Sequence, residues 1–424
     1  MKVLILGSGG REHALAWAVK RSKRVTEVVC APGNGGIGQV ARCVPVDLKS
    51  VESMVRLAIA EKPGLTIVGP ELPLSLGIVD ALEERGLRVF GPTQAAAMLE
   101  SSKAFAKRFL QRHNIPTAQY AVCTTAAELE AVIAGFQAPI VVKADGLAAG
   151  KGVIICPSRA IALEAAHDLF SGKLLGEAEV QVVIEEFLTG DELSFLCLSD
   201  GKDVAALAPA QDHKRIGEGD TGPNTGGMGA YSTDDLISAE TSAWMLGVAE
   251  KVVDGMKAEG TPFAGVLFTG FMMTPHGPKV LEFNTRFGDP ETEAILLRLE
   301  SDLVEILEAA VNGRVSGISI KLKPGASVCV IAASAGYPGK YVGGRLISGL
   351  DSVPDGVEVF HAGTKLKDGE IVTAGGRVLA VTAAGEDLRD ALAKVYGAME
   401  GISFEGMQYR RDIAWRALSA AGSA

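Results

Sequence analysis

Two lysines enclose a run of small residues at 143–152, where the sequence reads KADGLAAGKG and includes Gly146 and Gly150 between Lys143 and Lys151. Glycine lets backbone amides approach phosphate oxygens, and a lysine ammonium supplies a compact positive charge beside them. Strand-like sequence on both sides, and Gly152 where a Walker A loop has serine or threonine, exclude that motif. The segment predicts a phosphate cover in a different nucleotide-binding fold. An ordinary hairpin loop is the alternative.

An apolar strand that ends in an extended acidic segment follows at 182–192, with the sequence VVIEEFLTGDE. Backbone groups of such a segment can pair with a purine edge, and Glu192 can accept hydrogen bonds from ribose hydroxyls. Acidic residues at a strand end are otherwise simply solvated, so this assignment depends on the lysine loop before it. Lys103, at the start of a predicted helix, is a further candidate for phosphate. The predicted adenine contacts are Glu185, Glu186, Phe187 and Leu188.

Oxygen ligands for a metal ion occur at 279–291, in the sequence KVLEFNTRFGDPE. Glu282 and Asn284 share one face of a predicted strand. Their oxygens suit Mg²⁺, which keeps several waters and is commonly held by one or two protein groups together with nucleotide phosphates. Arg286 follows on the same alternation, and its planar fork suits a carboxylate or phosphate. Because buried polar residues need partners, a metal or ligand is favoured over a solvated sheet edge.

A glycine turn joins the first predicted strand to a helix at 7–15, with the sequence GSGGREHAL. Free backbone N–H groups and the helix dipole favour an anion at such a turn. It is a poor dinucleotide fingerprint, because Glu12 occupies the third glycine position and no acidic residue ends the next strand. A small phosphorylated ligand at Gly9 and Gly10 is therefore predicted. The alternative is that the glycines only allow close packing of strand and helix.

A polar segment in the middle of the chain joins QDHKR at 211–215 to the glycine-rich GPNTGGMG at 222–229. It predicts a binding wall built from a long loop. Asp212 and Lys214 are the predicted catalytic side chains, together with Arg286. His213 could act as a general base or a hydrogen-bond donor, but a lone histidine is more often structural.

The elements that must position these groups differ along the chain. Strand-like runs alternate with helical patterns up to about residue 91, the rhythm of a parallel sheet with crossover helices. Three strand runs and one helix at 139–185 predict a small α+β piece that could act as a lid. The stretch 214–231 is predicted to be a long functional loop. From residue 326, short strands and a helix at 386–399 predict a separate closing domain. This domain, including 336–339, either touches substrate or closes the core, and packing is favoured for most of it.

Composition narrows the class of protein. A chain of 424 residues that is 47% hydrophobic can bury a sizeable core in two to four domains. A net charge of -10 without basic runs argues against nucleic acid as a partner. The six cysteines are scattered singly, which disfavours disulfides and structural zinc and fits a reducing cytoplasm. No signal-like or membrane-spanning stretch is evident, so no membrane partner is expected, and a monomer is the default.

Taken together, these motifs resemble the phosphoribosylamine–glycine ligases of purine synthesis, along essentially the whole chain. The resemblance rests on 7–15, 68–71 (VGPE), 143–152, 211–215, 221–231 and 282–291. It implies a Rossmann-like N-terminal domain at 1–102, an ATP-grasp domain at 103–326 with a lid at about 121–187, and a C-terminal mixed α/β domain at 327–424. The fold class expected is thus α/β and α+β multidomain.

The resemblance also implies roles for particular residues. Lys103, Lys143 and the loop to Gly152 would contact ATP phosphates, and Glu282 with Asn284 would hold Mg²⁺ or Mn²⁺. Many ATP-grasp enzymes carry a further acidic ligand on the neighbouring strand, and 265–273 has none. Glu185 to Leu188 would contact adenine and Glu192 the ribose. Phosphoribosylamine would lie between two groups of residues, Gly9, Gly10, Asn34 and Glu71 on one side and Asp212 and Arg286 on the other.

The expected chemistry is ATP-dependent joining of glycine to phosphoribosylamine through glycyl phosphate, since a carboxylate must be activated before an amine can attack it. Closure of the lid would exclude water from the acyl phosphate. Another ATP-grasp carboxylate–amine ligase is the nearest alternative, but it would not share the whole segment 211–231. A nicotinamide-dependent oxidoreductase fits the glycine turn poorly. A non-catalytic nucleotide-binding module need not retain Glu282 and Asn284 beside Arg286.

Overall fold

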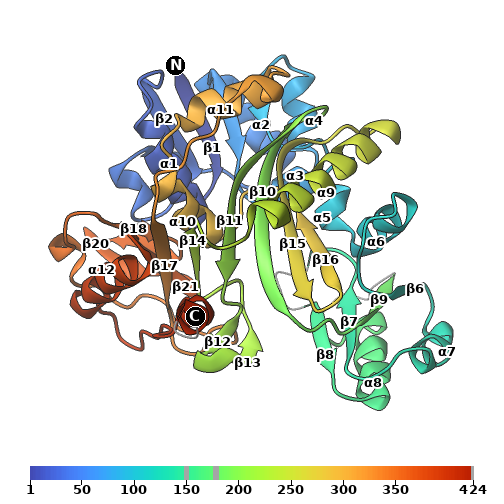
Figure 1. Cartoon of the computed structure of the whole chain (residues 1–424). Coiled ribbons are helices and arrows are strands. Elements are labelled where there is room, and N and C mark those ends of the chain that lie inside the picture. Colours follow the sequence, from blue (N-terminus) through green and yellow to red (C-terminus); the bar gives the residue numbers. More distant parts are fainter. Residues whose placement is uncertain (148–151, 175–180, 422–424) are drawn as a thin grey trace.

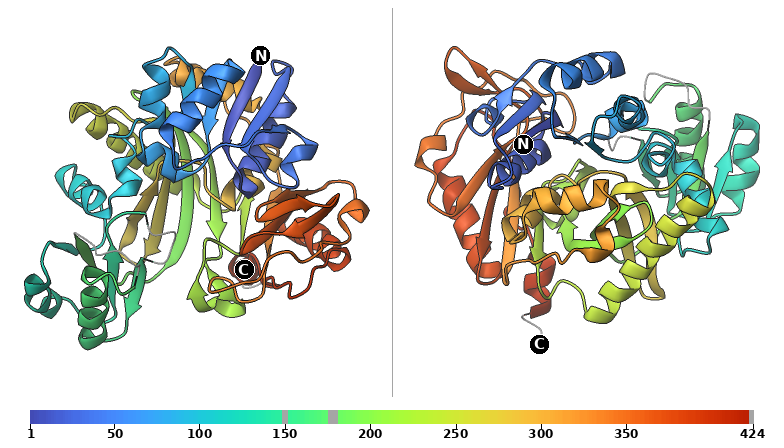
Figure 2. Two further views of the ribbon diagram at one scale, coloured as in Figure 1. Left: turned by 180° about the vertical axis from the view of Figure 1, so that it is seen from behind. Right: turned by 90° about the horizontal axis from the view of Figure 1, so that it is seen from above.

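Three larger sheets organise the computed structural model, which describes residues 1–147, 152–174 and 181–421. They have five, four and eight strands within the described residues. Figure 1 places the N-terminal part (blue) at the top, the four-stranded sheet (teal to green) at the lower right and the C-terminal part (red) at the lower left. The view from behind in Figure 2 agrees, so the central strands lie between three peripheral parts.

The N-terminal sheet is wholly parallel, in the order β3-β2-β1-β4-β5, which confirms the predicted α/β architecture. Side chains alternate across β1, so Val3 and Ile5 pack with α1 while Leu4 and Leu6 pack with α2 and α4. The strands are β1 (Lys2–Gly7), β2 (Glu27–Pro32), β3 (Arg42–Cys43), β4 (Leu65–Val68) and β5 (Val89–Phe90). The helices are α1 (Gly10–Lys20), α2 (Val51–Glu61), α3 (Glu71–Ser75) and α4 (Ile78–Glu83).

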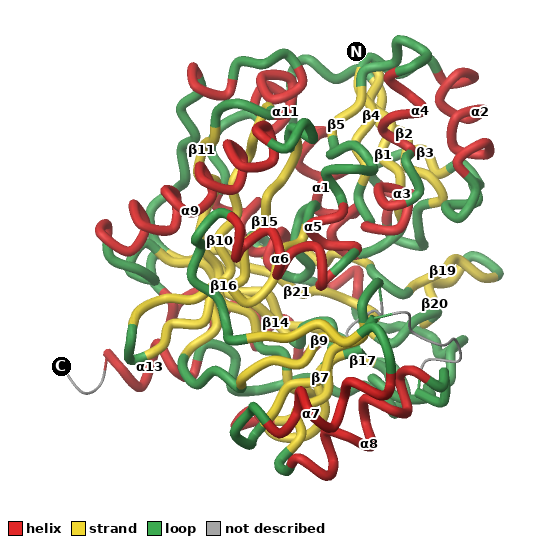
Figure 3. The backbone as a smooth tube through the Cα atoms, turned by 90° about the vertical axis from the view of Figure 1, so that its right-hand side faces the viewer, coloured by secondary structure: helices red, strands yellow, loops and turns green. Residues whose placement is uncertain are grey.

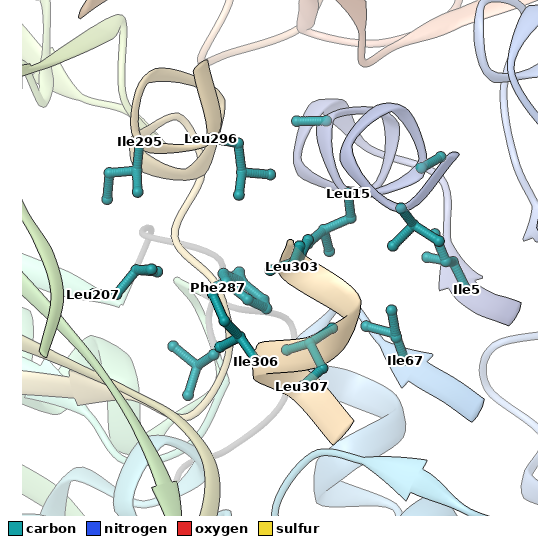
Figure 4. Packing of buried hydrophobic residues seen from close by; sticks show 14 of the residues in the cluster. Ile5, Leu15, Ile67, Leu207, Phe287, Ile295, Leu296, Leu303, Ile306 and Leu307 are labelled. Carbon is teal, nitrogen blue, oxygen red and sulfur yellow. The ribbon is translucent and has the colours of Figure 1, made fainter. Parts of the chain in front are cut away.

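One hydrophobic core joins this sheet to the centre of the molecule. Ile5, Leu15 and Ile67 belong to the same buried cluster as Leu303 and Leu307, as Figure 4 shows. The last two residues lie on α11 (Leu303–Val311), which follows α10 (Glu291–Arg298). Full burial of one such side chain contributes about 1.5–3 kcal/mol. The N-terminal sheet is therefore held against α11, which in turn packs on the central strands β10 and β15.

The central sheet is antiparallel, in the order β16-β15-β10-β11-β14-β17-β21-β18. Helix α9 (Ala239–Ala258) packs on β10 and β15 through a second apolar cluster. No helix of the described residues is both long and apolar enough to cross a bilayer. The eight strands are β10 (Asp191–Asp200), β11 (Val204–Asp212), β14 (Gly229–Thr233), β15 (Ala264–Thr274), β16 (Gly277–Asn284), β17 (Ala326–Ala333), β18 (Val357–His361) and β21 (Arg377–Gly385).

Two features of the centre differ from the sequence expectations. The stretch 214–231 is not one loop, because it contains the ribbon β12 (Arg215–Gly217) and β13 (Thr221–Asn224) and then β14, which pairs with β11. The C-terminal strands β17, β21 and β18 continue the central sheet, because β17 pairs with β14. The remaining C-terminal elements are β19 (Thr364–Lys367), β20 (Glu370–Thr373), α12 (Leu388–Gly401) and α13 (Trp415–Ala421).

The four-stranded sheet, order β6-β9-β7-β8, is the piece predicted to act as a lid. Its apolar face packs against α7 and α8. Figure 3 shows α5 and α6 between the N-terminal sheet and this four-stranded sheet. The elements are α5 (Met98–Ser101), α6 (Lys103–Arg112), β6 (Tyr120–Cys123), α7 (Leu129–Ala134), β7 (Ile140–Ala144), β8 (Val153–Cys156), α8 (Arg159–Phe170) and β9 (Val182–Glu186).

Candidate active site

A cavity of about 560 Å³ lies where the N-terminal part, the lid, the central sheet and the C-terminal part meet. It brings together most of the residues predicted from sequence, which are Glu71, Lys103, Lys143, Gly146, Gly152, Glu185, Asp212, Lys214, Glu282, Asn284 and Arg286. Glu192 lines a small adjoining hollow with Asp212, Lys214 and Glu282. Gly9, Gly10, Asn34, Glu186, Phe187 and Leu188 are not part of the lining. Gly150 and Lys151 fall outside the described residues.

The start of the lysine loop is tied to helix α6. Lys103 Nζ donates to the Gly146 carbonyl at 2.7 Å, and the Asp145 carboxylate accepts from the Ala104 amide at 3.0 Å and from the Ser102 hydroxyl at 3.1 Å. Gly146 has a φ of +107°, a conformation that glycine adopts without strain. Asp145 and Gly146, at the described start of the loop, are therefore held against α6.

A buried cluster of three charges lies behind this loop. Lys143 Nζ is 2.9 Å from Glu185 Oε1 and 3.0 Å from Oε2, and Lys107 Nζ is 3.0 Å from Oε2. Burial alone would raise the pKa of Glu185, but Lys143 and Lys107 outweigh it and the pKa is lowered. Burial lowers the pKa of Lys107 to about 8, against the opposing effect of Glu185. Lys107 was missed by the sequence analysis, although it follows Lys103 by one turn of the predicted helix.

Glu282 and Asn284 fit a divalent cation, which the ATP-grasp fold implies. Both line the cavity from β16, where Glu282 is opposite Gly270 and Asn284 is opposite Phe268. Within the described residues no hydrogen bond to Glu282 is present, and Asn284 Oδ1 accepts one from Arg286 Nη2 at 3.0 Å. Burial would raise the pKa of Glu282, but Lys214, Lys143 and Lys103 outweigh it and keep the carboxylate ionised. Free oxygens on an ionised group suit Mg²⁺ or a similar hard ion.

Glu282 and Asn284 are not part of a larger protein cage for a metal among the described residues. The described residues contain no group of three or more His, Cys, Asp or Glu side chains arranged to hold a metal. Two protein ligands are enough where nucleotide phosphates and water complete the coordination. The site thus fits an ion that arrives with a nucleotide better than a structural metal.

Arg286 connects three parts of the cavity wall. Its Nη2 lies 3.0 Å from Glu100 Oε1, and its Nε lies 3.3 Å from Glu71 Oε2. Glu100 also accepts from the Thr285 amide at 2.8 Å. These contacts hold the guanidinium beside Asn284, and the carboxylates of Glu71 and Glu100 fix the orientation of its plane. Glu100 was not predicted from the sequence, because it is far from Arg286 along the chain and no motif surrounds it.

Asp212 is a buried carboxylate at the end of β11 that faces the cavity. Its Oδ1 has no hydrogen-bond partner within the described residues, and its Oδ2 lies 3.8 Å from Lys214 Nζ. Burial, with the charge of Glu291, raises the pKa of Asp212 well above its usual value. Glu291 in turn accepts from the Ser194 hydroxyl at 2.9 Å. An unpartnered buried oxygen in a cavity is suited to receive a proton or to bind an amine.

His213 is structural. It is 1% exposed and is absent from the cavity lining. Its Nε2 accepts from the Ala414 amide at 3.0 Å, and its Nδ1 lies 3.3 Å from the Gly229 carbonyl. Burial lowers the pKa of His213 to about 4. The side chain therefore joins β11 and β14 to the C-terminal end and is no general base.

Two amides of the N-terminal glycine turn are bound by a carboxylate of the chain itself. The Glu12 carboxylate accepts from the Gly9 amide at 2.5 Å and from the Ser8 amide at 3.2 Å. Gly7 and Gly69 make room for it, because a Cβ at either position would lie within 2.4 Å of the Glu12 side chain. This arrangement supports the packing interpretation of the turn over the phosphate interpretation.

The Asn34 side chain is similarly occupied. Its Nδ2 donates to the carbonyls of Ser8 at 2.9 Å and His361 at 2.6 Å, and its Oδ1 accepts from the amides of Gly36 and Ile37. It ties the N-terminal part to the C-terminal part. From this region Arg11 and Glu71 reach the cavity instead.

The C-terminal part contributes directly to the cavity wall, so residues 337–339 do more than close the core, which was the role favoured for most of this domain. Tyr337 Oη accepts from the Gly226 amide at 2.9 Å. Arg377 donates to the carbonyls of Gly226 at 2.5 Å and Asp289 at 2.9 Å, and its Nη2 lies 3.1 Å from Asp289 Oδ1. Both residues line the cavity and hold the glycine wall in place. No local pattern around either residue indicated this contact.

Glu293, in the first turn of α10, is a buried acid close to the cavity. It is 0% exposed, and neither carboxylate oxygen has a hydrogen-bond partner within the described residues. A Cβ at Gly10 would lie 2.6 Å from its Oε1, so this glycine leaves space for the carboxyl group. Burial, with the charge of Asp289, raises the pKa of Glu293 well above its usual value.

We expect the stability of Glu293→Gln, relative to the unsubstituted chain, to rise between about pH 5 and about pH 9. Because the folded-state pKa lies above the unfolded value, the carboxyl group contributes fully at low pH and its contribution is lost as pH rises through the folded pKa. The glutamine side chain does not titrate, so the free energy of unfolding of Glu293→Gln should gain on the order of 1–3 kcal/mol over that of the unsubstituted chain. Urea unfolding at both pH values measures it. A difference that is independent of pH would contradict the prediction.

Three family models match the chain, one each for its N-terminal, central and C-terminal parts. Family models of phosphoribosylglycinamide synthetase match as its N domain at residues 1–100, its ATP-grasp (A) domain at 101–292 and its C domain at 327–416. A biotin carboxylase domain of Hydrogenobacter thermophilus 2-oxoglutarate carboxylase shares the fold, with a TM-score of 0.76 at 18% identity over 96% of this chain and 91% of that one. Fold and site together define an ATP-grasp enzyme.

Closer relatives define the family. The chain is 51% identical over 424 residues to phosphoribosylamine–glycine ligase of Xanthomonas axonopodis pv. citri, covering 99% of this chain and 98% of the relative. It is 50% identical to the ligase of that name from Pseudomonas aeruginosa, with 99% of each covered. The crystal structure of phosphoribosylamine–glycine ligase from Thermotoga maritima matches with a TM-score of 0.87 at 37% identity, covering 98% of this chain and 100% of that one. The chain belongs to the phosphoribosylglycinamide synthetase family.

Proposed function

We propose that this chain uses ATP to join glycine to 5-phosphoribosylamine, giving glycinamide ribonucleotide, ADP and phosphate in purine synthesis. One observation carries the proposal: a single cavity contains lysines suited to polyphosphate, an oxygen pair suited to a divalent ion, and Arg286 with Asp212 facing them. The relatives at about half identity bear the name of this activity. ATP and a divalent ion follow from the family, and we propose Mg²⁺ or Mn²⁺.

The first step activates the glycine carboxylate as glycyl phosphate, because a carboxylate resists attack by an amine. Lys103, Lys143 and Lys214 compensate the negative charge that develops as the phosphoryl group moves. Glu282 and Asn284 hold the divalent ion, which supplies positive charge to the phosphate oxygens when bound. Arg286 holds the carboxylate in line for transfer, since its fork matches two oxygens.

In the second step the amine nitrogen of phosphoribosylamine attacks the acyl carbon. The carbon–nitrogen bond forms, the carbon–oxygen bond to phosphate breaks, and phosphate leaves with the electron pair. Asp212, ionised beside Lys214, accepts the proton that the amine releases, because its Oδ1 has no hydrogen-bond partner among the described residues. Glu71 and Arg286 position the amine substrate. The predicted contacts of Gly9, Gly10 and Asn34 with this substrate remain part of the proposal, although these three residues are not among those that line the cavity.

The nucleotide lies between the lid and the central sheet in this proposal. Backbone groups of Glu185, Glu186, Phe187 and Leu188 contact the adenine, and Glu192 contacts the ribose. The loop that includes Gly146, Gly150, Lys151 and Gly152 covers the phosphates and keeps water from the acyl phosphate. The three units at 1–102, 103–326 and 327–424 supply the substrate wall, the nucleotide site and the closing wall. We also propose a cytoplasmic monomer.

Phosphate release from ATP, with each component omitted in turn, tests the proposal. Release that requires both glycine and freshly prepared phosphoribosylamine, and that yields glycinamide ribonucleotide, is the expected result. A chain that binds ATP but turns over with another carboxylate and amine would be a different ATP-grasp ligase. Reduction of a nicotinamide cofactor would refute the ligase assignment altogether.

A further inference from the structure

Lys107 is a buried lysine beside the nucleotide site that the proposed mechanism does not use. It lies on α6, is 3% exposed and lines the inner wall of the cavity. Its Nζ lies 3.0 Å from Glu185 Oε2 and donates to Thr117 Oγ1 at 2.7 Å. A buried ammonium is costly unless it is paired, so its position requires an explanation beyond packing.

The charge balance around Glu185 explains why Lys107 is buried here. Lys143 and Lys107 share this single carboxylate, which is 2% exposed. Without Lys107, Lys143 and Glu185 would form a neutral pair, and the carboxylate would cancel much of the field of Lys143. With Lys107 present, the cluster carries one net positive charge in a poorly hydrated wall. A polyphosphate in the cavity is attracted to that remaining charge.

Lys107 also fixes the geometry of the site. Thr117 Oγ1, which accepts from Lys107, donates to the Val280 carbonyl at 2.7 Å. Val280 lies on β16, two residues before Glu282. One ammonium therefore connects helix α6, lid strand β9 and the strand that carries the predicted metal ligands.

We propose that Lys107 is a positioning residue of the nucleotide site. Its ammonium holds and neutralises the Glu185 carboxylate, so that the charge of Lys143 remains available to the phosphates of ATP. The proposal rests on the ATP-dependent function proposed above. It assigns Lys107 an effect on nucleotide affinity that is exerted through Glu185 and without direct contact to the transferring group.

Calorimetric titration of the full chain with ATP tests the proposed role of Lys107 in four variants. Lys107→Met should weaken ATP binding about tenfold or more, which corresponds to about 1.4 kcal/mol. The double variant Lys107→Met/Glu185→Gln should regain most of that affinity, because glutamine removes the carboxylate that would otherwise neutralise Lys143. Glu185→Gln alone serves as the reference for the double variant, because the two variants lack the same carboxylate. Arg108→Met, on the exposed face of the same helix, is the matched control and should bind normally.

The double variant separates this role from a purely structural one. If Lys107 only stabilised the fold, removing a second buried polar group would not restore ATP affinity, so a double variant as weak as Lys107→Met would overturn the proposal. Unchanged affinity in Lys107→Met would overturn it as well. Failure of the unsubstituted chain to bind ATP would instead refute the proposed function, and this inference with it.

Discussion

Replacing Glu282 with glutamine should lower kcat for the complete ligase reaction by about a thousandfold, which is the upper range for loss of one group that stabilises a developing charge. Glutamine preserves the shape of the side chain but removes the negative charge that holds a divalent ion. Glu282 supplies the negative charge of the predicted metal pair, because Asn284 offers only a neutral amide oxygen. Phosphate release at saturating ATP, glycine and phosphoribosylamine measures the effect.

An exposed glutamate provides the control for this substitution. Glu300→Gln removes the same charge from the surface, and it should leave turnover unchanged. Excess Mn²⁺ or Mg²⁺ should restore Glu282→Gln only in part, because a ligand charge is missing. Retention of most of the activity by Glu282→Gln would show that the divalent ion is held elsewhere.

Replacing Arg286 with methionine should reduce kcat/KM for glycine by about a hundredfold to a thousandfold, the range for losing one partner of a buried charge pair. The guanidinium is held by Glu71 and Glu100, and it lies beside Asn284. Its removal takes away the group that fits a carboxylate and leaves two acids facing each other. ATP affinity measured by direct titration should change far less. Initial rates over a range of glycine concentrations give the value.

Arg286→Lys distinguishes charge from geometry. Lysine keeps the positive charge but lacks the planar fork, so its kcat/KM for glycine should lie between those of the unsubstituted chain and Arg286→Met. Equal losses for glycine and ATP in Arg286→Met would indicate general disruption of the cavity, and they would contradict a specific role in binding the carboxylate substrate.

The positions of Glu282, Asn284, Lys143 and Gly146 at the cavity could be predicted because their signals are local. Glu282 and Asn284 alternate along one strand, and the register shift between β15 and β16 falls before Glu282, so the two side chains still face the cavity together. Lys143 and Gly146 stand at the end of one strand and in the turn that follows it. Spacing within one element is sufficient for such predictions.

Residues that act through distant partners could not be predicted in the same way. Lys107 acquires its role from Glu185 on another element, and Arg377 acquires its role from Gly226 and Asp289. Strand β14 forms in a polar, glycine-rich stretch because β11 and β17 supply its hydrogen bonds. Long-range pairing of this kind overrides local propensity.

The glycine turn shows a different limit. Its sequence was compatible with an anion site, and the structure does place a carboxylate on the amides, but that carboxylate is the chain's own Glu12. A capping side chain competes with an external anion for the same donors. Sequence alone does not decide between the two acceptors, because both satisfy the same unpaired amides.

Transfer of an oxygen atom from glycine to phosphate tests the central claim most directly. Glycine labelled with ¹⁸O in its carboxylate is supplied with ATP, a divalent ion and phosphoribosylamine, and the released phosphate is analysed by mass spectrometry. Formation of glycyl phosphate predicts that each phosphate carries one oxygen from the glycine carboxylate. Product formed without any label in phosphate would contradict activation of glycine by phosphoryl transfer in this cavity.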